Sequence, residues 1–76
     1  MSKYRMCYAY YYRDDYTTLT NDKFFYFTSK KCMWDISYTD RTKMLEEHLF
    51  CLGEVTHPNA YTNGIIDFRY IDLTEI

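Results

Sequence analysis

The chain has 76 residues, of which 47% are hydrophobic, 26% are charged and 21% are aromatic, and its formal net charge is −2. Its length is that of one domain spanning residues 1–76, and its hydrophobic content argues against a disordered chain. The charge is uneven, +2 over residues 1–38 and −4 over residues 39–76, and this layout argues against a simple nucleic-acid-binding protein, which usually carries a basic surface.

Residues 3–13 predict the first strand, because aromatic residues dominate this segment and neither glycine nor proline interrupts it. Alternation along a strand divides the segment into two faces. Because Cys7 and Ala9 are small enough for a helix to pack closely, we expect their face to be covered and the opposite face to be exposed. The aromatic residues on the opposite face are Tyr4, Tyr8, Tyr10 and Tyr12.

Residues 14–22 are polar and form a connection longer than a tight hairpin turn, so they are predicted to be an exposed loop. Residues 23–29 predict the second strand, in which phenylalanines and Tyr26 alternate between the two faces. A basic turn at residues 30–31 follows. Residues 32–36 are predicted to form a third strand.

Residues 40–52 predict the helix of the domain. Ser37 or Thr39 can cap its N-terminus, and Gly53 is suited to the position that follows the C-terminus. The apolar stripe at helical spacing consists of Met44, Leu45, His48, Leu49 and Leu52.

The remaining residues predict a loop and a final strand. Residues 54–56 are a candidate short strand and residues 57–59 a loop. Asn63 and Gly64 together are typical of a type I′ hairpin turn. The last strand is expected over residues 65–73, with one face formed by Ile66, Phe68 and Tyr70 and the other by Ile65, Asp67, Arg69 and Ile71.

These elements predict an α+β domain with the order β-β-β-α-(β)-β. It consists of a small antiparallel sheet of three to five strands with one α-helix (about 40–52) packed on one face. One helix covers one face of such a sheet, yet both faces carry large apolar residues. We therefore expect an uncovered aromatic face, for which tyrosine is suited because its ring gives contact area while its hydroxyl stays hydrated.

The sequence contains no pattern of residues that indicates an enzyme, a metal site or a cofactor. Three cysteines and two histidines occur at unrelated spacings without a Cys-x-x-Cys pair, so the thiols are expected to be packed core residues. No glycine-rich phosphate loop is present, and no nucleophile signature surrounds any cysteine. Such a short chain also has little length with which to enclose a deep pocket. The prediction is a non-enzymatic binding protein.

The predicted partner is another protein, which aromatic side chains would anchor and acidic side chains would attract if its surface is basic. A stoichiometric inhibitor or adaptor that acts by occlusion fits this pattern. Glu54 and Asp72 are further acidic residues to test. The candidate binding residues are Tyr8, Tyr10, Tyr12, Tyr26, Trp34, Tyr38, Glu46, Glu47 and Asp67.

Two other binding modes remain open at this point. A homodimer could pair the uncovered faces, and an aromatic sheet could stack single-stranded nucleic acid, although the acidic C-terminal half opposes the second mode. The residue usage indicates an AT-rich genome, and small proteins of this kind are common in bacteriophages, where they disarm host enzymes or defence systems. No membrane segment or signal peptide is recognisable, so we expect a cytoplasmic protein, in the host cytoplasm if it is viral.

Overall fold

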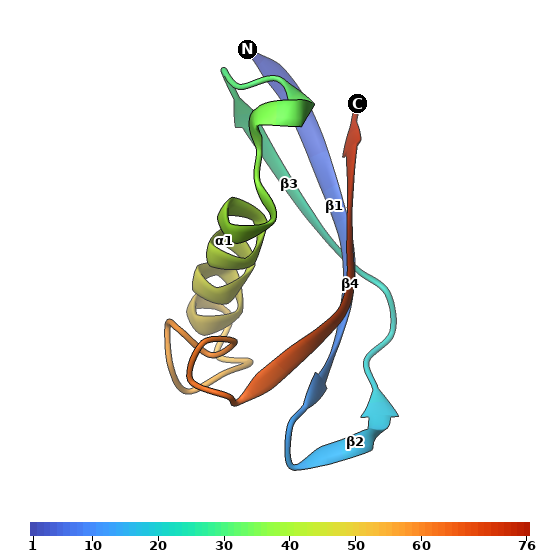
Figure 1. Ribbon diagram of the computed structural model, residues 1–76, viewed down its shortest axis with the longest axis vertical. Coiled ribbons are helices and arrows are strands. Elements are labelled where there is room, and N and C mark those ends of the chain that lie inside the picture. The colour runs from blue at the N-terminus through green and yellow to red at the C-terminus, as the bar shows by residue number, and fades with distance from the viewer.

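A computed structural model describes all 76 residues and confirms the predicted fold class, a small α+β domain with one helix on an antiparallel sheet. Figure 1 shows the helix α1 on one side of the sheet and no helix on the other. The elements are β1 (Ser2–Tyr12), β2 (Asp15–Leu19), β3 (Lys23–Ser29), the 3-10 turn η1 (Met33–Asp35), α1 (Tyr38–Cys51) and β4 (Ile66–Glu75).

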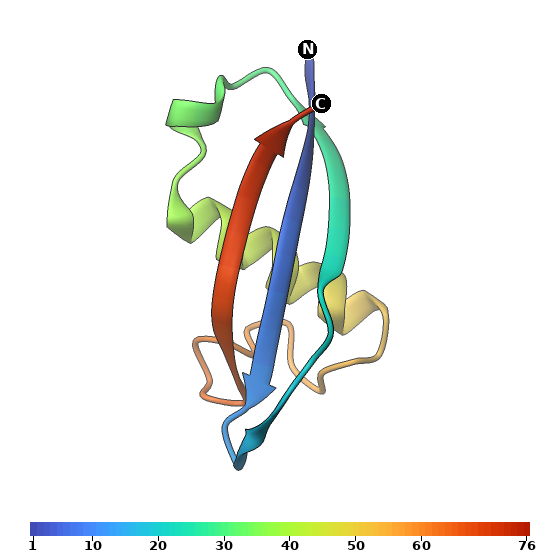
Figure 2. The ribbon, with the colours of Figure 1, turned by 90° about the vertical axis from the view of Figure 1, so that its right-hand side faces the viewer.

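The first strand, β1, lies at the centre of the sheet and pairs antiparallel with all three other strands. The strand β4 runs along one edge of β1 for almost its whole length. Both β3 and β2 therefore share the opposite edge, β3 beside residues 2–8 and β2 beside residues 11–12. Figure 2 shows this order, with β4, β1 and β3 side by side and α1 behind them.

The strand register decides which side chains lie beneath the helix. Tyr8 and Tyr10 are about 1% exposed and belong to the core cluster with Leu45 and Leu49 of α1. The expectation that the even-numbered tyrosines lie on the uncovered face is therefore wrong. The covered face of β1 is formed by Tyr4, Met6, Tyr8, Tyr10 and, at its margin, Tyr12.

Two tyrosine hydroxyls of β1 reach beyond the core and bond to loops. Tyr4 is fully buried, and its hydroxyl donates to the carbonyl of Lys31 at 2.7 Å. The Tyr12 hydroxyl donates to the carbonyl of Glu54 at 2.9 Å. The Tyr4 ring thus contributes apolar area to the core, and the two hydroxyls fix the segments before and after the helix.

A β-bulge in β4 changes the face assignment of its residues. Ala9 is opposite Tyr70 and Tyr10 is opposite Phe68, so Arg69 has no partner on β1. Phe68 and Ile71 consequently both face the helix, and Tyr70 faces the open side. The predicted grouping of Tyr70 with Phe68 is wrong because strict alternation does not continue through the bulge.

The helix begins and ends where its capping residues predict. The backbone N–H of Asp40 donates to Ser37 Oγ at 3.1 Å, which makes Ser37 the N-cap. At the other end Gly53 has a φ of +77°, and its N–H bonds to the carbonyl of Phe50 at 3.0 Å. The N–H of Glu54 bonds to the carbonyl of Leu49 at 2.9 Å, which completes a Schellman motif.

The buried face of α1 differs in part from the predicted stripe. Leu45 and Leu49 are fully buried as expected, but Thr42 and Glu46 are buried beside them, and Leu52 is 59% exposed. The helix is thus turned about its own axis, so that the residues facing the sheet differ in part from the predicted stripe. Met44 and His48 lie toward β3, where the His48 ring centroid is 4.6 Å from that of Phe25.

Four local predictions are corrected by the structure. The expected loop at 14–22 contains the strand β2. The expected third strand at 32–36 is instead the short 3-10 turn η1, and residues 54–56 form no strand. Only Gly53 and Gly64 have a positive φ, so Asn63 does not adopt the conformation that a type I′ turn requires.

Candidate functional site

The uncovered side of the sheet, here called the open face, presents side chains from three strands. Its centre is β1, and the register places residues of β3 and β4 on either side. Figure 2 views the sheet from this side. The open face consists of Lys3, Arg5, Cys7, Ala9 and Tyr11 of β1, Phe24, Tyr26 and Thr28 of β3, and Asp67, Tyr70, Asp72 and Thr74 of β4.

Two aromatic residues of β3 are the most exposed large apolar groups of the open face. Phe24 is 48% exposed and Tyr26 is 60% exposed. Arg5 lies opposite Tyr26, and its guanidinium carbon is 5.4 Å from the centroid of the Phe24 ring. This distance is within the range of a cation–π contact, so the arginine holds one side of the exposed ring.

A second aromatic group lies further along β1. The rings of Tyr11 and Tyr16 are 5.7 Å apart, and the Tyr16 hydroxyl donates to Asp67 Oδ2 at 3.4 Å. Arg13 approaches Asp67 at 4.0 Å, and its guanidinium carbon lies 5.4 Å from the Tyr61 ring centroid. Asp67 therefore already has two local partners at this end of the sheet.

The charges of the open face are balanced. Burial, followed by the carboxylates of Asp22 and Asp72, raises the pKa of the Cys7 thiol, and Arg5 acts in the opposite direction. Both signs of charge thus surround the middle of the face. A balanced face lacks the continuous positive charge that attracts a phosphate backbone.

Three of the predicted binding residues are not available at the surface. Tyr8 and Tyr10 lie beneath α1, and burial raises the pKa of Tyr8 to about 12. Glu46 is 2% exposed, and its Oε1 has no hydrogen-bond partner. Burial raises the pKa of this carboxyl. The sequence prediction missed that a glutamate beside the helix stripe would be enclosed.

The other predicted residues are accessible but do not form one site. Tyr26 lies on the open face, whereas Trp34, Tyr38 and Glu47 belong to the helix layer. Trp34 is 87% exposed on the 3-10 turn and Tyr38 is 50% exposed at the first position of α1. Tyr12, 38% exposed, lies at the edge of the covered face. The predicted set is therefore divided between the two sides of the sheet.

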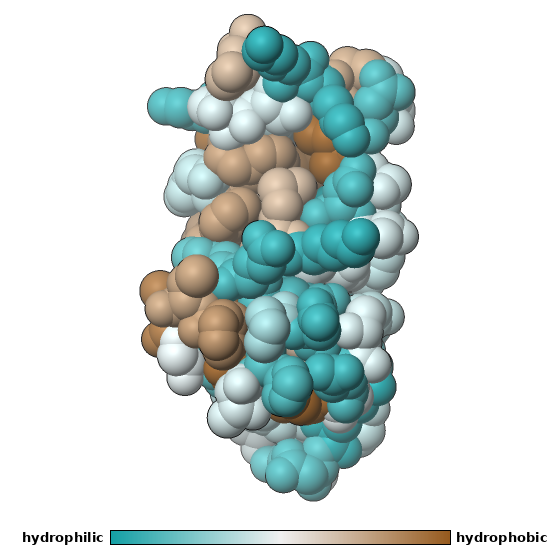
Figure 3. All heavy atoms as spheres, turned by 90° about the vertical axis from the view of Figure 1, so that its left-hand side faces the viewer, coloured by the Kyte–Doolittle hydropathy of each residue, from teal (hydrophilic) through white to brown (hydrophobic).

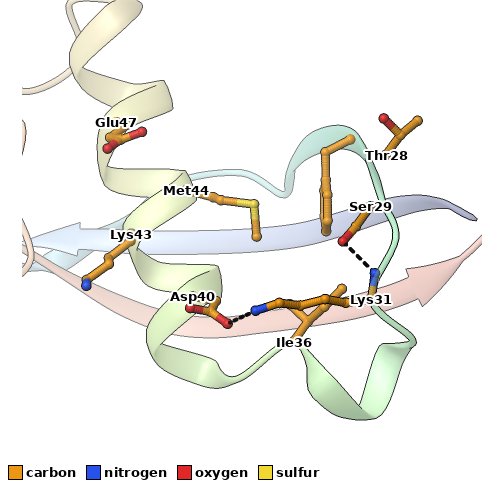
Figure 4. A pocket seen from close by; sticks show the side chains of 9 residues that line it. Thr28, Ser29, Lys31, Ile36, Asp40, Lys43, Met44 and Glu47 are labelled. Atoms are coloured by element: carbon orange, nitrogen blue, oxygen red, sulfur yellow. Dashed lines mark hydrogen bonds and ion pairs between the residues drawn. The ribbon is translucent and has the colours of Figure 1, made fainter. Parts of the chain in front are cut away.

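A groove of about 310 Å³ lies on the helix side, between α1 and the outer edge of β3. Figure 3 shows this side of the molecule, and Figure 4 shows Met44 of α1 pointing toward β3. Phe27, Ile36 and Met44 provide its apolar lining. The Lys31 ammonium donates to Asp40 Oδ2 at 3.4 Å at the margin of the groove, and this bond lowers the pKa of the Asp40 carboxyl.

Other potential reactive groups are scattered. Cys32 and Cys51 are exposed and Cys7 is half-buried, so the prediction that all three thiols pack in the core is wrong for the first two. The structure brings together no group of three or more residues that could hold a metal ion. The one α-helix is neither long enough nor apolar enough to cross a membrane.

No family model matches this chain, and no curated protein or solved structure shows significant similarity to it. The candidate site is therefore defined by its own geometry. Phe24 and Arg5 are not among the residues that the sequence predicted to bind a protein partner. The signal that could have identified them is the pairing of β1 with β3, which places a basic residue beside two aromatic ones.

Proposed function

We propose that this chain is a non-enzymatic protein-binding module whose open face contacts the partner. The observation that carries the proposal is the adjacent exposure of Phe24 and Tyr26, at 48% and 60%, on a rigid strand. Exposed apolar groups that gather on one face are typical of interaction sites. The nearby Arg5 adds a residue type that, like tyrosine, is enriched among residues that dominate binding energy.

The mechanism in this proposal is occlusion of a partner surface. The sheet backbone is fixed by hydrogen bonds, so Phe24 and Tyr26 lose little conformational freedom on binding. Cys7 of β1 lies opposite Phe24 and is small, so it adds little bulk beside the exposed rings. A stoichiometric inhibitor or adaptor of a cellular protein, such as a phage protein directed against a host enzyme or defence system, would act in this way.

The test uses the chain as bait for affinity capture from a host lysate, with partners quantified by mass spectrometry. Phe24→Ala and Tyr26→Ala should each weaken capture by at least about tenfold, the effect of removing one strong anchor. Phe50→Ala is the matched control, because Phe50 is 45% exposed on α1, away from the open face. It should leave capture unchanged.

Two results would contradict the proposal. The first is that the double variant Phe24→Ala, Tyr26→Ala keeps its fold and still captures the partner. The second is a partner that is lost in Trp34→Ala alone, because Trp34 lies in the helix layer and its loss would move the binding surface to η1.

Single-stranded nucleic acid is the second candidate ligand of the same face. One arrangement favours it: Lys3 and Arg5 lie opposite Thr28 and Tyr26, so basic groups border the exposed rings. Stacking of bases on such rings would be accompanied by a strong dependence of affinity on salt. Fluorescence anisotropy with labelled oligonucleotides at low salt tests this, and the absence of binding there excludes it.

A further inference from the structure

The outer edge of β3 is a strand edge without a neighbour. The strand β3 pairs only with β1, and Figure 2 shows no other element beside it. Its residues between Lys23 and Lys30 include no charged residue, proline or glycine. Soluble proteins usually protect exposed edges with such residues, because an unpaired edge is a template for another strand.

Hydrogen bonds on β1 fix which backbone groups of β3 point outward. The carbonyl of Lys3 accepts from the N–H of Ile76 at 2.8 Å, so the backbone of Lys3 points to β4. The carbonyl of Tyr10 accepts from the N–H of Thr20 at 3.1 Å on the opposite edge. Successive residues of a strand alternate in this direction. The even-numbered residues of β1 therefore bond to β3.

The partners of those even-numbered residues on β3 are the odd-numbered ones, from Lys23 to Ser29. The N–H and C=O groups of Phe24, Tyr26 and Thr28 consequently point away from β1, where no strand lies. These groups can form a further antiparallel ladder without disturbing the bonds that hold β3 in the sheet.

We infer that β3 pairs with β3 of a second copy of this chain, antiparallel and around a two-fold axis at Tyr26. This register places Phe24 opposite Thr28 of the partner subunit and Tyr26 opposite the partner subunit's Tyr26. Each such pair has outward backbone groups on both strands, so each exchanges two N–H···O bonds. The two sheets become one continuous sheet with two-fold symmetry.

Charge complementarity selects this register over its neighbours. With the axis at Tyr26, Asp22 lies opposite the partner subunit's Lys30, and by symmetry Lys30 lies opposite the partner subunit's Asp22. Both residues are exposed, and neither forms an ion pair within one chain. Moving the axis to Phe25 or Phe27 separates these charges. Opposite charges that face each other across strands stabilise the pairing.

The helix side of the same edge offers space for the second copy. The register places Phe25 of the partner subunit directly beside Phe27, in a pair whose side chains approach closely. Phe27 and Met44 line the groove of about 310 Å³ between β3 and α1. The ring of the partner's Phe25 would lie beside this groove and bury apolar surface that one chain leaves exposed.

The opposite edge of the sheet lacks these properties. The strand β4 carries three acidic residues, Asp67, Asp72 and Glu75, and one basic residue, Arg69, which forms a bulge. Pairing two copies of β4 would bring acidic groups together, and bulges and charges both discourage edge pairing. The proposal therefore concerns β3 alone, and it does not depend on the proposed function of the open face.

Sedimentation over a concentration series tests the proposal, and a reversible dimer is the expected result. Lys30→Asp and Asp22→Lys should each raise the dimer dissociation constant by about tenfold, because each places like charges in contact at two symmetric positions. The double exchange, Asp22→Lys with Lys30→Asp, should restore dimerisation. Arg69→Asp serves as the control, because it changes the charge by the same amount as Lys30→Asp but at the β4 edge. It should leave the dimer dissociation constant unchanged.

A second variant tests the backbone ladder independently of charge. Thr28→Pro removes an N–H that points outward, so it should abolish the dimer while circular dichroism shows an intact fold. A chain that stays monomeric at all concentrations overturns the proposal. A dimer that survives Thr28→Pro shows that β3 is not the interface. If the double exchange does not restore the dimerisation lost in each single exchange, the proposed register is wrong.

Discussion

The guanidinium carbon of Arg5 lies 5.4 Å from the centroid of the Phe24 ring, across two neighbouring strands. The Nε atom of this arginine is shielded from solvent and has no hydrogen-bond partner. The contact with the Phe24 ring is therefore made without a hydrogen bond from this Nε atom. This arrangement gives the open face a fixed shape around Phe24.

Adjacent phenylalanines of β3 should respond differently to truncation. Phe25 contacts His48 and Phe27 beneath the helix, whereas Phe24 is 48% exposed. We expect Phe25→Ala to lower the free energy of unfolding by about 2–4 kcal/mol and Phe24→Ala by less than about 1 kcal/mol. Urea denaturation measures both values, and equal losses would contradict the face assignment.

Removing the Tyr4 hydroxyl should loosen the segment before the helix. This hydroxyl belongs to a fully buried tyrosine and donates to the carbonyl of Lys31 at 2.7 Å. Tyr4→Phe should lower the free energy of unfolding by about 1 kcal/mol, and hydrogen exchange should become faster around residues 30–36. Tyr11→Phe on the open face serves as the control, for which no change in exchange around these residues is expected.

The buried Glu46 should make stability depend on pH. Burial raises the pKa of this carboxyl above its ordinary value of 4.5. As pH rises through that value, the unfolded chain releases its proton first, so the folded state loses relative stability until its own carboxyl ionises. The stability advantage of Glu46→Gln over the native chain should therefore grow as pH rises above the ordinary value of 4.5. If thermal denaturation gives the same difference in stability between the two proteins at every pH, this prediction is wrong.

Replacement of Gly53 should weaken the end of the helix. Its φ of +77° is unfavourable for a residue with a β-carbon, although no atom lies within 4 Å of that position. Gly53→Ala should lower the free energy of unfolding by about 1–2 kcal/mol through backbone strain alone. Because space is not limiting, Gly53→Asn should be less harmful than Gly53→Ala, which chemical denaturation of the two variants can check.

The three cysteines should differ in their reaction with a thiol reagent. Cys32 and Cys51 are exposed, whereas Cys7 is half-buried and its pKa is raised mainly by burial. Because the thiolate is the reactive form, a raised pKa lowers its population near neutral pH. We expect two fast modifications and one slow one, and Cys7→Ser should remove the slow phase.

Local signals in the sequence predicted the helix well. Ser37 and Gly53 are a cap and a terminator that act through neighbouring backbone groups, so α1 could be placed to within two residues. The face of β1 could not be predicted in the same way. Alternation separates Tyr8 and Tyr10 from Cys7 and Ala9, but it does not say which set meets the helix.

The missing information lies in pairing between distant strands. The neighbours of the even-numbered residues are Phe25 and Phe27 on β3 and Ile71 on β4, all large and apolar. The neighbours of Cys7 include Asp72, which favours solvent. The bulge at Arg69 adds a further shift that a strict period of two cannot reveal. For the same reason Arg5 and Phe24 were not recognised as neighbours.

The central position of β1 also has a consequence for how the chain folds. Its pairing with β3 closes a short segment, whereas its pairing with β4 joins Tyr4 to Glu75, nearly the full length of the chain. Loop-closure entropy therefore opposes the second pairing more than the first, and such non-local contacts slow folding. Until β4 docks, one edge of β1 is unpaired, and the rings of Tyr8 and Tyr10 lack their edge-on contacts with Phe68. We therefore expect the pairing of β4 with β1 to form late in folding and to complete the burial of these rings.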